Sequence, residues 1–125
     1  MGTLRTHEGW RVRGFNALVT DGALSNTVRD VSSDVTKFGG WQVNNPNAAD
    51  TFIQLFDKPA SQVVLGTTIP FYVIKIEDTT LGPALDHFEF SNGIEVTGSL
   101  SCAATTTETG NAAPTTAVPT YILYK

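Results

Sequence analysis

Residues 50–78 read DTFIQLFDKPASQVVLGTTIPFYVIKIED and contain two runs rich in β-branched and aromatic residues, Thr51 to Phe56 and Phe71 to Ile76. The segment between the runs holds two prolines and a glycine, which interrupt regular structure. This pattern predicts two strands of a sheet joined by a long connection, on which the rest of the chain packs.

The first of these runs is apolar on both of its faces. In an extended strand Ile53 and Leu55 point one way, while Phe52 and Phe56 point the other way. Such a strand is expected mid-sheet in a sandwich, with a second layer, an arm or a neighbouring subunit over its other face. The run from Phe71 to Ile76 predicts the same burial on two sides.

Length and composition indicate one soluble all-β domain. The chain has 125 residues, and its 16% charged fraction, together with abundant Thr, Ala, Gly and Asn, favours strands and turns over long helices. A single cysteine, Cys102, excludes an intrachain disulfide and indicates folding in a reducing compartment. No signal peptide or membrane span is recognisable.

Charge divides the chain into two parts. Residues 1–14 carry three arginines against one glutamate, so this segment has a charge of +2 and the rest has −6. The net charge of −4 argues against a nucleic-acid binder, which needs clustered Lys and Arg. We interpret residues 1–14 as an extended arm and residues 15–125 as the β-domain. Trp10 in the arm is expected to pack on its own domain or on another subunit.

Further strands are predicted on both sides of the central pair. Phe15 to Thr20 is a first strand, and Ala23 to Val31 is its possible hairpin partner. Ser32 to Asp34 is expected to break the pattern. Val35 to Val43 is another strand, in which Gly39-Gly40 predicts a bulge or bend because no helix follows that would make it a phosphate loop.

The C-terminal third alternates with period two. From Phe88 to Ala104 the even positions are mostly apolar and the odd ones mostly polar, which predicts strands with one wet face. Asn92-Gly93 predicts either a hairpin turn or a kink in one continuous strand. Thr105 to Thr120 is too polar to order itself and is expected to be mobile or held by a partner. Tyr121 to Tyr124 predicts a final strand inside the sheet.

The residues offer little catalytic chemistry. Two histidines and one cysteine cannot complete a structural zinc site, and no calcium loop is present, so no metal or other cofactor is expected. A triad of Asp86, His87 and Cys102 is conceivable, but Cys102 has the parity of the dry face and His87 the opposite one. The carboxylate pairs Glu77-Asp78 and Asp86/Glu89 are interpreted as solvated strand-end charges. We therefore do not expect an enzyme.

A set of short motifs resembles a recurrent pattern in small virion proteins of tailed bacteriophages. They are residues 44–58 with their Leu-Phe-Asp ending, Leu65 to Pro70, Phe90 to Ile94, the threonines after Ala104, and the closing Ile122 to Lys125. The resemblance covers roughly residues 44–125. It implies a jelly-roll-like antiparallel β-sandwich that assembles with copies of itself on the virus particle.

Among such proteins the resemblance favours a capsid cement or decoration protein on the capsid surface, assembled in the host cytoplasm. It favours a homotrimer. The N-terminal arm lies outside the resemblance, but its positive charge and its tryptophan suit an anchor, so we expect it to bind the major capsid protein, with Arg5, Trp10, Arg11 and Arg13 as the candidate contact residues. The partners expected are thus sister copies and the shell, and neither nucleic acid nor membrane. The alternative is a tail or head-fibre domain that binds a glycan on the host surface.

Overall fold

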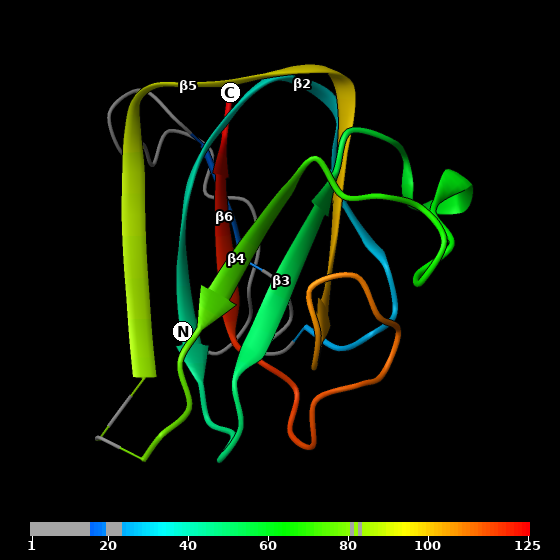
Figure 1. Cartoon of the computed structure of the whole chain (residues 1–125). Helices are drawn as coiled ribbons and strands as arrows, with labels where there is room; N and C mark the ends of the chain where they lie inside the picture. Colours follow the sequence, from blue (N-terminus) through cyan, green and yellow to red (C-terminus); the bar gives the residue numbers. More distant parts are fainter. Residues whose placement is uncertain (1–15, 20–23, 81, 83) are drawn as a thin grey trace.

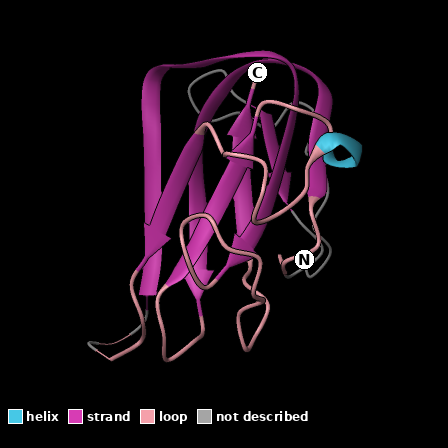
Figure 2. Cartoon of the chain, turned by 45° about the vertical axis from the view of Figure 1, so that its right-hand side comes forward, coloured by secondary structure: helices cyan, strands magenta, loops and turns pink. Residues whose placement is uncertain are grey.

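Six antiparallel strands make up almost all of the regular structure in the computed structural model, which describes residues 16–19, 24–80, 82 and 84–125. One short 3-10 helix lies in the connection after the third strand (Figure 2). The elements are β1 (Asn16–Val19), β2 (Arg29–Asn45), β3 (Thr51–Phe56), η1 (Ala60–Gln62), β4 (Tyr72–Ile76), β5 (Ala84–Thr105) and β6 (Thr120–Tyr124).

The strands form one sheet in the order β1-β6-β2-β5-β3-β4, and each of the neighbouring pairs is antiparallel. The all-β prediction is therefore confirmed. The strand β3 lies between β5 and β4, and β6 lies between β1 and β2, so the two predicted mid-sheet positions are also confirmed.

The two long strands β2 and β5 carry the sheet around a bend (Figure 1). The second half of β2 pairs with β6 and with the first half of β5, whereas the second half of β5 pairs with β3. Irregularities of register interrupt the β2–β5 ladder at four places, and such bulges bend a strand pair. The sheet consequently curls, and its two halves enclose a core.

Residue contacts show that the curl closes on itself. Although β2 and β4 are separated by two strands in the sheet order, the ring of Tyr72 lies 5.7 Å from that of Phe38 and 5.8 Å from that of Trp41. Phe38 is fully buried. The core cluster joins residues from β2 to β6 with Leu24 and Val118, which form an isolated bridge.

The predicted bend at Gly39-Gly40 is confirmed. Gly40 has a φ of 142°, and a Cβ at this position would overlap the carbonyl oxygen of Phe88. At the same place the ladder advances by two residues on β2, from Phe38 to Gly40, but by five on β5, from Ile94 to Glu89. The extra residues of β5 include Asn92-Gly93, so the kinked continuous strand, and not the hairpin turn, is the correct alternative.

The predicted burial of β3 on both faces is confirmed, and its cover comes from the chain itself. All of its residues except Phe52 are buried. The side chain of Gln54 is fully buried, and its Nε2 donates to Oγ1 of Thr105 at 2.7 Å and to the carbonyl of Gly110 at 3.0 Å. The threonine-rich segment thus lies against β3.

The same prediction is wrong for β4. Ile74 and Ile76 are buried, but Lys75 between them is exposed, and Val73 is half-buried. β4 pairs only with β3 and is an edge strand in the described part of the sheet. Its exposed Lys75 forms ion pairs with Asp50 and Glu77, and charged side chains of this kind are common on edge strands.

Two predictions about the N-terminal third are also wrong. β1 pairs with β6, and among the described residues 24–31 Leu24 bridges to Val118 while the stretch from Arg29 belongs to β2, so the predicted hairpin between the first strand and Ala23 to Val31 does not form. Ser32 to Asp34 does not end a strand, because β2 runs through these residues from Arg29 to Asn45. The polar residues stay within the strand because the β2–β5 ladder is irregular between Asp30 and Ser32 and again between Ser32 and Val35.

The threonine-rich segment is ordered by hydrogen bonds, which overturns the prediction that it cannot order itself. Asn47 holds it reciprocally: its Nδ2 donates to the carbonyl of Thr116 at 2.8 Å, and its Oδ1 accepts from the Thr116 N–H at 2.7 Å. Asn26 donates to the carbonyl of Asn111, and Pro114 and Val118 are buried. Polar contacts with distant residues replace the missing apolar burial.

Candidate functional site

An aromatic cluster joins β2, β4 and the first half of β5 across the curl of the sheet. We use this name for Phe38 and Trp41 of β2, Phe71 and Tyr72 at the start of β4, and Phe88 and Phe90 of β5. Their rings lie between 4.9 and 6.2 Å from their neighbours in the cluster, in stacked, tilted and edge-to-face pairs. Offset-stacked and edge-to-face arrangements are the favourable ones for pairs of aromatic rings.

Exposure rises across the cluster from the core to the surface. Phe38 is fully buried, Trp41 is 7% exposed, and Phe88 is 45% exposed. The Phe88 ring stacks on Trp41 with a centroid distance of 5.3 Å and an interplanar angle of 30°. The Trp41 Nε1–H donates to Oδ2 of Asp86 at 2.6 Å, which fixes the indole beneath the exposed ring.

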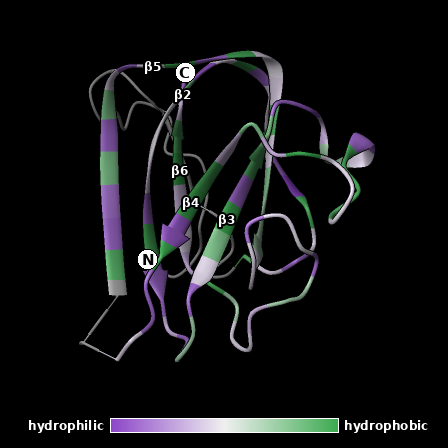
Figure 3. Cartoon of the chain, in the orientation of Figure 1, coloured by the Kyte–Doolittle hydropathy of each residue, from purple (hydrophilic) through white to green (hydrophobic). Residues whose placement is uncertain are grey.

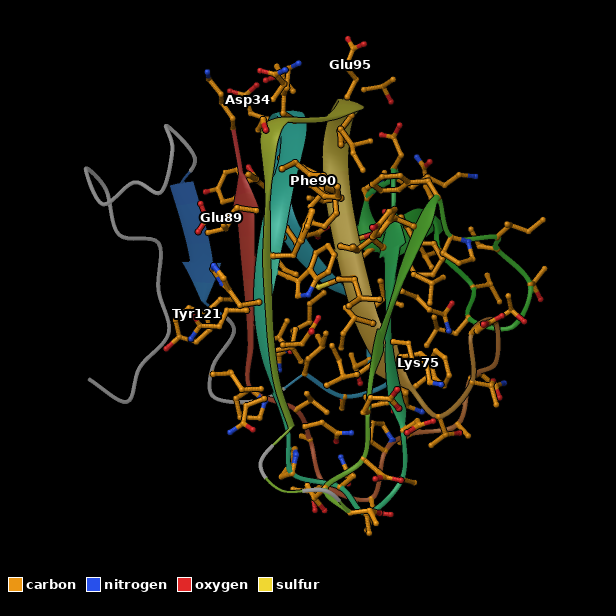
Figure 4. The ribbon with its side chains drawn as sticks, turned by 60° about the vertical axis from the view of Figure 1, so that its left-hand side comes forward. Asp34, Lys75, Glu89, Phe90, Glu95 and Tyr121 are labelled. Atoms are coloured by element: carbon orange, nitrogen blue, oxygen red, sulfur yellow. The ribbon has the colours of Figure 1, made fainter. Side chains whose placement is uncertain are left out.

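The first half of β5, which carries these rings, is an edge of the described sheet. Residues 84–95 pair with β2 on one side only, because β3 pairs with residues 101–105. Along this half, hydrophobic and hydrophilic residues alternate (Figure 3). Phe90 points into the fold, whereas Glu89 points to the other side of the strand (Figure 4).

Leu85 adds a second exposed apolar side chain to this edge. It is 61% exposed, and its odd position puts it on the face opposite to Phe88. We use the name aromatic edge for the backbone of residues 84–90 together with the exposed side chains of Leu85 and Phe88. Apolar side chains on both faces of an edge strand are typical of a surface that a partner covers.

The predicted period-two burial of β5 holds only in part. Val96, Leu100, Cys102 and Ala104 are buried as expected. Phe88 is not, and at the other end the odd positions Ser101, Ala103 and Thr105 are buried as well. The Ser101 hydroxyl donates to the carbonyl of Lys58 at 2.7 Å, so the connection after β3 covers this end of the strand and leaves it no wet face.

The structure does not bring the conceivable triad together. Cys102 is fully buried, and burial raises the pKa of its thiol to about 12. His87 is exposed, and its Nε2 lies 2.9 Å from Oε2 of Glu89. Asp86 receives the indole N–H of Trp41 instead of orienting His87. The buried thiol is therefore no nucleophile.

The carboxylate pairs have structural partners. Hydrogen bonds from the side chain and the backbone of Thr80 lower the pKa of Asp78. Lys75 pairs with Glu77 at 3.8 Å and with Asp50 at 3.5 Å. In the part of the chain that the structure describes, no three His, Cys, Asp or Glu side chains gather in a way that could hold a metal ion.

A cleft of about 270 Å³ lies between the turn at residues 46–51 and the threonine-rich segment. The asparagines beneath it are engaged: Asn45 Oδ1 accepts from the backbone N–H and the side-chain amide of Asn47, and also from the Thr51 hydroxyl. Its Nδ2 donates to three carbonyls, among them that of Ile76. The polar groups here tie the two loops to the sheet.

The predicted capsid-binding residues Arg5, Trp10, Arg11 and Arg13 lie outside the described residues, as does the whole of the arm. The aromatic edge is the surface that the sequence did not single out. Its signal was present in the edge residues themselves: the apolar Leu85 has odd parity, out of phase with the even run that starts at Phe88. Among helices in the described ranges, none has the length and apolarity needed to span a membrane.

Comparison with known proteins gives one partial match. A family model described as the cleavage site for pathogenic type III effector avirulence factor Avr is similar to residues 31–62, which are 32 of the 125 residues. These residues form most of β2, all of β3 and the helix η1. Searches of curated proteins and of solved structures found no match.

Proposed function

We propose that this chain is a bacteriophage capsid cement or decoration protein, which binds the assembled head and stabilises it. In this proposal the curled sheet is a jelly-roll-like β-sandwich, and three copies form a homotrimer on the capsid surface. The observation that carries the proposal is the aromatic edge, since Leu85 is 61% and Phe88 is 45% exposed on a stretch of β5 that is paired on one side only among the described strands. A surface of this kind is expected in a protein that functions in an assembly.

Each molecule in such an assembly needs only a modest contact with the shell. Residues 1–14 contribute three arginines and Trp10, a combination that suits an anchor on the major capsid protein. If three arms are tethered in one trimer, binding of the first raises the effective concentration of the others, so weak contacts add to a durable clamp.

The remaining chemistry agrees with a structural role. The only thiol is buried with its pKa raised to about 12, and the exposed imidazole of His87 pairs with Glu89. The similarity of residues 31–62 to a protease cleavage site does not enter the proposal. Those residues lie mainly within paired strands, whereas proteolysis favours exposed loop tips.

One observation favours the alternative, a tail or head-fibre domain that binds a host glycan. Sugar rings stack on exposed aromatic faces, and Phe88 is exposed, rigidly backed by Trp41 and flanked by Asp86 and His87. A glycan array tests this function: binding that is lost in the variant Phe88→Ala supports it, and an array without any bound glycan excludes it.

Co-sedimentation with phage heads that lack the protein tests the main proposal. The full-length chain is expected to pellet with the heads. A variant without residues 1–14 is expected to keep the circular dichroism spectrum of a folded β-domain and to stay in the supernatant. Full-length protein that never pellets with heads contradicts the function, and a truncated variant that still pellets removes the arm from it.

A further inference from the structure

Four large apolar side chains in the described part of the chain are strongly exposed, and they form two pairs. Val64 is 61% exposed and Ile69 is 84% exposed, and they flank one turn of the connection between β3 and β4. Leu85 and Phe88 form the aromatic edge. The connection projects on the right of the molecule in Figures 1 and 2, and the first half of β5 lies on the left in both.

The first pair sits on a preformed turn, which we call the knob and define as residues 64–69. The carbonyl of Val64 accepts from the N–H groups of Thr67 and Thr68 at 3.0 and 2.8 Å. The Val64 N–H donates to Oγ1 of Thr68 at 2.9 Å, and Gly66 supplies the positive φ of 86°. Because the turn is closed by its own hydrogen bonds, docking it on a partner orders little additional chain.

The base of the knob is fixed as well. The Ala60 N–H at the start of η1 donates to Oδ1 of Asp30 at 2.8 Å. Oδ1 of Asp57 accepts from both the N–H and the hydroxyl of Thr97, at 3.0 and 2.9 Å. The connection that carries the knob is therefore fixed to the rest of the fold where it begins, and the carboxylates of Asp30 and Asp57 are engaged in holding it.

Charge distinguishes the two surfaces. The aromatic edge carries the carboxylate of Asp86, whose hydrogen-bond donor is the uncharged indole of Trp41, so two such edges placed together would bring like charges close to each other. Near the knob, Lys58 is exposed beside the engaged carboxylate of Asp57. Contact between a knob and an edge thus joins unlike surfaces, whereas contact between two edges does not.

We propose that the knob of one copy docks on the aromatic edge of the next copy. The contact is head-to-tail, and it buries both exposed pairs through one kind of interface; when the rotation between copies closes, it makes a ring. This inference deepens the proposed function, on which it rests for the number of copies in the ring. A two-fold contact between two knobs would leave Leu85 and Phe88 exposed to water, and one between two aromatic edges would leave Val64 and Ile69 exposed.

Complementation between two variants tests the direction of the contact. Ile69→Asp places a charge on the knob, and Leu85→Asp places one on the aromatic edge. Each variant alone is expected to run as a monomer of 13.4 kDa in light scattering. An equimolar mixture is expected to form a dimer of twice the 13.4 kDa chain mass, since one intact knob meets one intact edge and the ring cannot close.

Ala113→Asp is the matched control, because Ala113 is exposed on a different loop and its variant is expected to keep the oligomer of the parent chain. Circular dichroism and thermal unfolding establish that each variant is folded. A monomeric parent chain, dissociation by only one of the two variants, or a mixture that stays monomeric overturns the head-to-tail contact. Pelleting of the parent chain with heads is measured separately, so the ring can fail while the proposed function holds.

Discussion

Gly40 is a residue of β2 at which an added Cβ would overlap the backbone of β5. Its positive φ is unfavourable for other residues, and its missing side chain leaves room for the carbonyl oxygen of Phe88. The sequence predicted a bulge or bend at Gly39-Gly40, because a glycine pair inside a strand pattern has few other uses. It did not predict the partner strand, which lies almost fifty residues later in the chain.

The variant Gly40→Ala is expected to be destabilised by about 2–5 kcal/mol, because strain at positive φ adds to a clash with backbone. Urea unfolding measures the change. Gly98→Ala is the control: Gly98 also has a positive φ, 130°, but nothing lies within 4 Å of the added Cβ. Equal losses in the two variants would contradict the close approach of the strands.

Cys102 gives a prediction about pH. Its pKa is raised by burial from 9.0 to about 12, so above pH 9 the unfolded chain loses a proton that the folded chain keeps. Ionisation of the thiol therefore has no effect on stability below pH 9, and it lowers the free energy of unfolding by about 1.4 kcal/mol per pH unit between pH 9 and 12.

The comparison of the parent chain with Cys102→Ala between pH 8 and 11 checks this. The free energy of unfolding is expected to fall more steeply in the parent chain, and the folded parent is expected not to react with a thiol reagent at pH 8. Parallel curves for the two proteins, or rapid labelling of the folded chain, would contradict the burial of this thiol.

At the scale of residues, parity predicted the face on which a side chain lies but not how deep it lies. Cys102 and Phe88 have the same parity, and only Cys102 is buried. The difference arises because the half of β5 that contains Cys102 is paired with β2 on one side and β3 on the other, whereas the half that contains Phe88 is paired with β2 alone among the described strands. Such depth depends on pairing between distant segments, which local alternation does not contain.

Among the elements, the strands with strong local patterns were predictable. The run Thr51 to Phe56 is β3 itself, and Phe71 to Ile76 differs from β4 by one residue. The length of β2 was not predictable, because Ser32 to Asp34 reads as a break. These polar residues remain in the strand since the ladder with β5 bulges around them.

The threonine-rich segment shows a limit of composition as a guide. Its order comes from hydrogen bonds with Asn47 and Gln54, which belong to other parts of the chain. Composition measures how much apolar surface a segment can bury, and it says nothing about polar partners elsewhere. An ordered polar loop was therefore missed.

Asn47→Ala removes both side-chain hydrogen bonds to Thr116, and it is expected to cost about 1–3 kcal/mol and to loosen the segment. Amide hydrogen exchange should then accelerate in residues 106–117 while β3 stays protected. Asn44→Ala, at an exposed position of β2, is the matched control and is expected to leave the exchange unchanged. Unchanged exchange in Asn47→Ala would show that the clamp does not hold the loop.

For the whole molecule, the proposed anchor on the shell is basic, so its binding is expected to depend on salt. Replacing Arg5, Arg11 and Arg13 together by Ala should weaken co-sedimentation with heads, and 0.5 M NaCl should weaken the binding of the parent chain in the same way. Lys125→Ala, which removes an exposed positive charge at the other end of the chain, serves as the control. If neither 0.5 M NaCl nor the replacement of the three arginines changes the amount of protein that pellets with heads, the arm has no electrostatic role in binding.

Whole-molecule architecture was predictable as a class and not in its topology. Alternation and composition predicted an all-β domain, but the curl depends on β2 and β5, each of which serves both halves of the sheet. The same curl leaves the first half of β5 paired on one side only, with β2, and Leu85 and Phe88 on this half are exposed. The candidate surface is thus a consequence of topology, and it became visible only with the structure.

The mass of the purified chain in solution, measured by light scattering over a range of concentrations, is the most direct test of the claim that its exposed apolar surface is covered by other copies. The account predicts a particle of three chains, about three times 13.4 kDa. A mass that stays at 13.4 kDa at every concentration would contradict it.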